Sequence, residues 1–91
     1  MQNNKNKLAN DTTPKQRQRL LRWLQKKPIT TIEARHQLDI LGVAPRIYEL
    51  RNKFGCNIKT FWANGTNPAG SRHRLAKYVL FQGQYKKGEN K

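Results

Sequence analysis

A chain of 91 residues has room for one small domain with a modest hydrophobic core. Its 19 Lys and Arg residues outnumber 5 Asp and Glu residues, and the formal net charge of +14 predicts strong attraction to polyanions. Nucleic acid is the first candidate and an anionic membrane surface the second. The membrane alternative is weak, because no apolar run approaches the roughly 18 residues that a spanning helix needs. The N-terminus also lacks an apolar stretch of signal-peptide type.

The cysteine, histidine and carboxylate residues give no pattern of a catalytic or metal site. The single cysteine, Cys56, excludes an internal disulfide and fits a reducing cytoplasm. With His36 and His73 it forms no recognisable metal-ligand spacing, and the acidic residues show no paired-carboxylate pattern. We therefore expect a cytoplasmic protein that is not an enzyme and holds no metal or cofactor.

The first elements in chain order are an arm and a basic helix. Residues 1–12 are Asn-rich, charged and nearly free of apolar residues, which predicts a disordered arm. Thr13 is the expected N-cap and Pro14 the first residue of a helix that runs to about Lys27. Its apolar residues fall on one face, at Leu20, Leu21 and Leu24. Its basic residues are candidates for phosphate contacts: Arg17, Arg19, Arg22, Lys26 and Lys27.

A second, shorter helix is predicted after an extended link at Ile29. Thr30 and Glu33 have the T-x-x-E spacing of a capping box, which starts a helix at Thr31. We expect this helix to end between positions 38 and 40, with Ala34 turned inward. Gly42 marks the turn that follows.

The third helix is predicted over residues 43–54, with Gly55 at its C-terminal end. At 100° per residue, Ile47, Leu50 and Phe54 fall on the buried face. The remaining surface carries the groups that we expect to reach a major groove, which is wide enough for one helix. These candidates are Arg46, Glu49, Asn52 and Lys53.

The candidates on this helix have alternatives that the sequence leaves open. Arginine can contact guanine and asparagine can contact adenine with two hydrogen bonds each. For Arg46, Asn52 and Lys53, a base contact, a phosphate contact and simple solvation all remain. For Glu49 we favour an ion pair with Arg46 or Lys53 over a contact with cytosine. Arg51 is suited to supporting the helix as well as to touching DNA.

After residue 55 the apolar period changes from 3.6 to 2, which predicts a β-hairpin. Ile58, Thr60 and Trp62 are expected to share a face on one strand, and Ala76, Tyr78 and Leu80 to share a face on the other. The segment 63–74 is rich in Asn, Gly and Pro and forms the tip. We expect its last basic residues to contact the DNA backbone or minor groove: Arg72, His73 and Arg74. Residues 83–91 are a polar tail.

This order of elements predicts a small α+β domain over residues 13–82, with three helices followed by a hairpin wing. The basic charge is concentrated outside the third helix: residues 1–28 contain eight basic and one acidic residue, whereas residues 29–54 contain four and three. The distribution fits a protein whose periphery binds phosphates while a less charged helix reads bases.

Four segments together resemble a family of small bacterial and phage winged helix-turn-helix proteins. They follow the patterns T-x-x-E-A, R-[IV]-x-E-L-R, N-I-x-T-x-W and H-R-x-A-[KR]-Y-x-L, between about residues 12 and 85. In that family a proline often opens the third helix where this chain has Val43, whereas here the proline is Pro45. The resemblance implies a DNA-binding module, often found in phage or prophage settings in bacterial cells.

We therefore expect sequence-specific binding to double-stranded DNA by a phage or mobile-element transcriptional regulator. The helix at 43–54 would enter the major groove, and the wing at 63–74 would contact the backbone or minor groove. The alternatives are an architectural factor that bends DNA for an integrase, a small phage protein that inhibits a host protein, and an RNA or single-strand binder. A homodimer through the first helix and a monomer are both compatible with the sequence.

Overall fold

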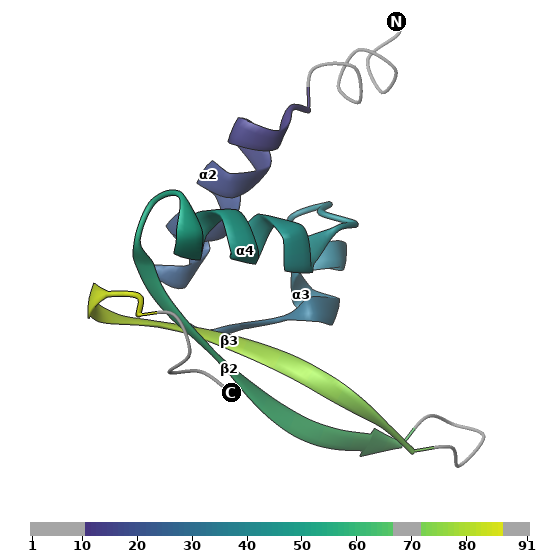
Figure 1. The fold of residues 1–91 in the computed structure, drawn as a ribbon. Helices are drawn as coiled ribbons and strands as arrows, with labels where there is room; N and C mark the ends of the chain where they lie inside the picture. Colours follow the sequence, from purple (N-terminus) through teal and green to yellow (C-terminus); the bar gives the residue numbers. More distant parts are fainter. Residues whose placement is uncertain (1–10, 67–71, 87–91) are drawn as a thin grey trace, which may run out of the picture.

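The computed structural model describes residues 11–66 and 72–86, which form three helices and a three-stranded antiparallel sheet (Figure 1). Most of the predicted arm (residues 1–10), the loop of the hairpin (67–71) and the end of the predicted tail (87–91) lie outside the described residues. The predictions for those three segments therefore stay predictions.

Helix α2 (Thr13–Leu24) begins one residue earlier than predicted, because Thr12 supplies the cap. The Thr12 Oγ1 atom accepts a hydrogen bond from the Lys15 N–H at 3.4 Å. The predicted end at Lys27 is also wrong. After the cap, the Lys26 N–H donates to the Trp23 carbonyl at 2.9 Å, three residues back and not four, and this tighter turn ends the helix early.

The extended link that was expected after this helix is a strand. Strand β1 (Ile29–Thr30) pairs antiparallel with β3 (Arg72–Gln84), and Ile29 lies opposite Tyr78. Two residues are too few to show an alternating pattern, so the pairing was not visible in the sequence. It joins the first part of the chain to the last and makes β3 the central strand, in the order β1-β3-β2.

Helix α3 (Thr31–Gln37) starts with the predicted capping box. The Thr30 Oγ1 atom accepts from the Glu33 N–H at 3.1 Å, and Glu33 Oε1 accepts from the Thr30 N–H at 2.9 Å. The turn after α3 depends on Asp39, at φ 58°, and not on Gly42, at φ −93°. Aspartate tolerates this left-handed conformation better than most residues, which is why no glycine is needed there.

Helix α4 (Val43–Asn52) ends two residues earlier than predicted. Gly55 has the expected role at its C-terminal side: its φ is +70°, and its N–H donates to the Arg51 carbonyl at 3.1 Å. Because residue 54 follows the last helical turn, the 100° step no longer applies to it. The prediction of a buried Phe54 is therefore wrong, and its side chain is 58% exposed.

Strands β2 (Cys56–Thr66) and β3 form a long hairpin that reaches past the helices toward its tip (Figure 1). The register places Ile58 opposite Leu80, Thr60 opposite Tyr78, and Trp62 opposite Ala76. These pairs confirm the two shared faces that the period of 2 predicted. Strand β3 continues to Gln84, past position 82, where the sequence pattern placed the end of the domain.

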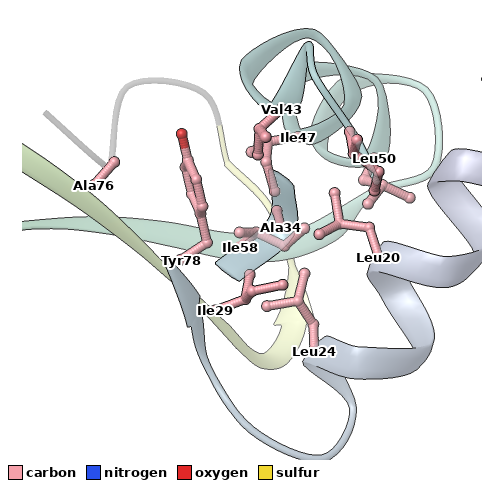
Figure 2. Close-up of a cluster of buried hydrophobic side chains, with 11 residues drawn as sticks. Leu20, Leu24, Ile29, Ala34, Val43, Ile47, Leu50, Ile58, Ala76 and Tyr78 are labelled. Carbon is pink, nitrogen blue, oxygen red and sulfur yellow. The ribbon is translucent and has the colours of Figure 1, made fainter. Parts of the chain in front are cut away.

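The core lies between the three helices and the inner face of the sheet (Figure 2). Eleven buried side chains from every helix and strand form it: Leu20, Leu24, Ile29, Ala34, Ile40, Val43, Ile47, Leu50, Ile58, Ala76 and Tyr78. No buried polar or charged residue is found among the residues described. The core therefore holds α4 against the sheet by apolar contacts, and leaves its outer side to solvent.

Candidate nucleic-acid interface

The outer side of α4 is an uncharged stripe, which we call the α4 stripe. It consists of four exposed residues of the helix at helical spacing, Ala44, Pro45, Tyr48 and Asn52, and of exposed Leu41, which precedes the helix by two positions. Leu41 is 78% and Tyr48 is 60% exposed. The Asn52 Nδ2 group donates to the Tyr48 carbonyl at 2.9 Å, so the amide is held along the helix. Of the predicted groove residues, Asn52 lies in the stripe, and exposed Lys53 follows it as the helix cap.

The exposed side of α4 is rotated about the helix axis from the predicted exposed side, because α2 packs against one flank of the helix. Glu49 was expected to point away from the core, and this is wrong: Glu49 faces α2, where its Oε1 atom accepts from Arg17 at 2.9 Å. Its Oε2 atom accepts from Arg46, also at 2.9 Å. The intramolecular pair favoured between Glu49 and Arg46 is thus confirmed. The same rotation turns Tyr48 toward solvent.

Arg46 is held on the α2 side of α4 by three acceptors, two on α2 and one on α4. Its guanidinium donates to Thr13 Oγ1 at 3.1 Å, to Gln16 Oε1 at 3.4 Å and to Glu49. Its side chain is only 17% exposed, so a contact with a base would need the guanidinium to leave all three acceptors. The base contact expected for Arg46 stays a prediction, and its position here indicates that it fixes α4 against α2.

Arg51 supports the base of the hairpin. Its Nε donates to the Ile58 carbonyl at 2.7 Å and its Nη2 to Thr60 Oγ1 at 2.6 Å. Its guanidinium also lies 5.2 Å from the centre of the Tyr85 ring. Burial lowers the pKa of the Arg51 guanidinium below its ordinary value. The supporting role that the sequence left open for Arg51 is confirmed.

The five basic residues predicted to bind phosphates on the first helix fall into two groups. Arg17 is paired with Glu49, and its guanidinium lies 5.1 Å from the centre of the Phe54 ring. Arg19 donates to the Leu38 carbonyl at 3.0 Å and to both carboxylate oxygens of Asp11. The hydrogen bonds from Arg19 hold the pKa of Asp11 below its ordinary value. The other three residues are exposed and available to an external anion: Arg22, Lys26 and Lys27.

A groove lies between α3 and the part of the hairpin that is near the hairpin tip, and we call it the wing groove. It is lined by two exposed basic residues, Arg35 and Arg74, and by apolar and polar groups from both elements: Thr31, Ile32, Trp62 and Ala76. The Arg74 guanidinium lies 4.4 Å from the centre of the Trp62 ring. Trp62 shares a face with buried Ile58 but is 55% exposed, because the hairpin extends beyond the helices at this point.

Arg74 is thus exposed, as a contact with DNA from the wing requires. The backbones of Arg72 and His73 belong to β3, but their side chains are outside the described structure, so their predicted contacts stay predictions. Sequence reasoning missed Arg35 and Tyr48. Arg35 is one exposed charge on a seven-residue helix and gave no signal. The spacing 41, 44–45, 48 and 52 is a helical period that could have indicated the stripe.

The described residues show no sign of a membrane span or a metal centre. Over residues 11–66 and 72–86, no helix is long and apolar enough to cross a membrane. The same ranges hold no group of three or more His, Cys, Asp or Glu side chains that could hold a metal ion.

The carboxylate of Glu49 is expected to make stability depend on pH. The hydrogen bond from Arg17 is the largest cause that holds the pKa of Glu49 below its ordinary value of 4.5. A depressed pKa in the folded state stabilises the protein above pH about 4.5, and that contribution is lost as the pH falls further. Glu49→Gln should therefore flatten the dependence of the urea midpoint on pH below this value. Equal pH profiles for the two proteins would contradict the effect.

The fold and the interface define a class: three short helices, the third with an exposed outer side, joined to a sheet whose hairpin forms a basic wing. This is the architecture of a winged helix-turn-helix DNA-binding domain. The chain belongs to a family of winged helix-turn-helix domains, whose sequence profile matches residues 15–83. No curated protein and no solved structure is significantly similar to the chain.

Proposed function

We propose that this protein binds double-stranded DNA at a specific sequence and acts as a transcriptional regulator of a phage or mobile element. In this proposal α4 enters the major groove through the α4 stripe, and the wing, residues 63–74, lies on the backbone or in the minor groove. The observation that carries it is the accessible outer side of α4, which has no acidic residue and lies in a chain of net charge +14.

Two basic surfaces support the proposed binding mode. Arg35 and Arg74 lie on opposite sides of the wing groove, one on α3 and one on the hairpin. In helix-turn-helix domains the helix before the recognition helix crosses the DNA backbone, which places α3 and its Arg35 next to phosphates. The exposed basic residues at the end of α2 add a second surface, which we assign to phosphate contacts outside the central site.

Selection from random duplex DNA tests this function directly, followed by anisotropy on the recovered sequence at several salt concentrations. We expect a recovered motif and an affinity that falls steeply as salt rises. Salt-sensitive binding without a recovered motif would contradict a sequence-reading regulator and favour an architectural factor of the recombination type. Absence of binding near physiological salt would refute DNA binding and favour inhibition of a host protein.

The wing groove gives the same experiment a residue-level control. The double variant Arg35→Ala with Arg74→Ala should weaken all duplexes about equally and reduce the salt slope by about two. Lys77→Ala is the matched control, because Lys77 is exposed on the same hairpin but lies on the opposite face of β3 from Arg74. A salt slope unchanged by the double variant would remove the wing groove from the interface.

A further inference from the structure

The α4 stripe lacks the side chains that most often recognise guanine. The commonest specific contact in the major groove joins arginine or lysine to the O6 and N7 atoms of guanine. Helix α4 contains two arginines, Arg46 and Arg51. The first donates to Thr13, Gln16 and Glu49, and the second to Ile58 and Thr60. Both guanidinium groups are thus held inside the domain, on flanks of α4 that do not face the proposed groove.

The acidic side chain of α4 is also held by hydrogen bonds within the domain. A carboxylate that reads DNA accepts a hydrogen bond from the N4 amino group of cytosine. Both oxygens of Glu49 instead accept from arginines, at 2.9 Å each. Asp39 belongs to the turn before the helix and lies outside the stripe. The outer side of α4 therefore presents no charged group to a guanine–cytosine pair, apart from Lys53 at its C-terminal cap.

What the stripe does present is apolar surface with two polar groups, the Tyr48 hydroxyl and the Asn52 amide. Leu41 and Tyr48 are the most exposed of its large side chains, at 78% and 60%, and exposed Ala44 and Pro45 complete the apolar part. In the major groove the apolar feature of the bases is the C5-methyl group of thymine. At the other end, one N–H of Asn52 Nδ2 donates to the Tyr48 carbonyl, which leaves Oδ1 to accept from N6 of adenine and the second N–H to donate to its N7.

We infer that α4 reads its DNA site through thymine methyl groups, which pack on Leu41, Ala44, Pro45 and Tyr48, and not through guanine. The inference rests on the proposed function, and it names the chemistry of the site: adenine–thymine pairs at the positions that α4 contacts. Affinity comes from phosphate contacts at the periphery, because the exposed basic residues lie mostly on other elements and the stripe itself has no charge. An apolar stripe gains from burial against methyl groups, because both surfaces leave water.

Removal of single methyl groups from the DNA tests the inference. The probe is the duplex recovered by selection, prepared with deoxyuridine in place of thymidine at one position at a time, which deletes one methyl group and keeps the base pair. We expect about fourfold weaker binding for each methyl group that α4 contacts. Substitution by 5-bromouracil, whose bromine fills the volume of the methyl group, should restore most of the affinity.

Protein variants locate the effect on α4. In Tyr48→Ala the deoxyuridine penalty should fall toward one at the positions that Tyr48 covers. Phe61→Ala is the matched control, because Phe61 is a similarly exposed aromatic residue, at 49%, on the outer face of the sheet. It should keep the full penalty. Both variants remove exposed side chains, so each should unfold near the wild-type denaturant midpoint.

The outcomes separate this inference from the proposed function. Motif-specific, salt-sensitive binding that is unchanged by deoxyuridine at every position would overturn the thymine inference and leave the function intact. A motif whose central contacts are guanines would overturn it as well. Failure of the selection to yield any motif would refute sequence-specific binding, and with it the reading of methyl groups.

Discussion

Ile47→Ala is expected to lower the free energy of unfolding by about 2–5 kcal/mol. Ile47 is 1% exposed at the centre of α4 and belongs to the one core that joins the helices to the sheet (Figure 2). Truncation would lose apolar burial and leave a cavity, because a small domain has few neighbouring side chains that can shift to fill it. Domains are commonly stable by about 5–15 kcal/mol, so this single change would remove a large share of the stability.

Chemical denaturation followed by tryptophan fluorescence measures the effect, and the next residue in the chain supplies the control. Tyr48→Ala truncates a larger side chain one position away, but that side chain is 60% exposed, and we expect a change within about 0.5 kcal/mol. A similar loss of stability in both variants would show that the orientation of α4 is not as described. The comparison thus tests the rotation of the stripe without DNA.

The parts of the fold that the sequence could predict are those with a local signal. The capping box at Thr30 and Glu33 is read from two residue types at fixed spacing, and the hairpin faces follow from a period of 2. Strand β1 had no such signal, since its partner Tyr78 lies 49 positions further along the chain from Ile29. Pairing over that separation depends on the tertiary fold, which local patterns do not contain.

The candidate site was predictable in its elements but not in its surface. The sequence predicted that α4 would be the helix with an accessible outer side, and the helix bounds were close. A helical wheel centred on Ile47 treated everything opposite as exposed, and it could not show that α2 covers the flank with Arg46 and Glu49. Arg17 lies 32 positions before its partner Glu49, so this contact had no counterpart in local spacing. The charged residues that were candidates for DNA contacts thus lie on a flank of α4 that α2 covers.

Arg46→Ala and Asn52→Ala are expected to have opposite effects. Arg46 makes two hydrogen bonds from α4 to α2 and a third within α4 to Glu49, so its loss should lower the free energy of unfolding by about 1–3 kcal/mol. The bases preferred by the folded fraction should not change. Asn52 is exposed, so Asn52→Ala should keep stability within about 0.5 kcal/mol. It should reduce discrimination at one base pair by about 1–3 kcal/mol.

The measurements are a denaturation midpoint and a repeated selection from random duplex DNA for each variant. If Arg46 contacts a base, its variant would show a relaxed preference at one position and an unchanged midpoint, which contradicts the packing role. If Asn52 is only solvated, its variant would match the wild type in both experiments. We expect each variant to change only one of the two measurements, because the two side chains differ in burial. The Arg46 side chain is 17% exposed and is hydrogen-bonded across the interface with α2. The Asn52 amide bonds only its own helix and keeps an oxygen for the groove. With that result, sequence specificity would come from the least charged surface of a strongly basic protein, and the charged residues of α4 would fix the orientation of that surface.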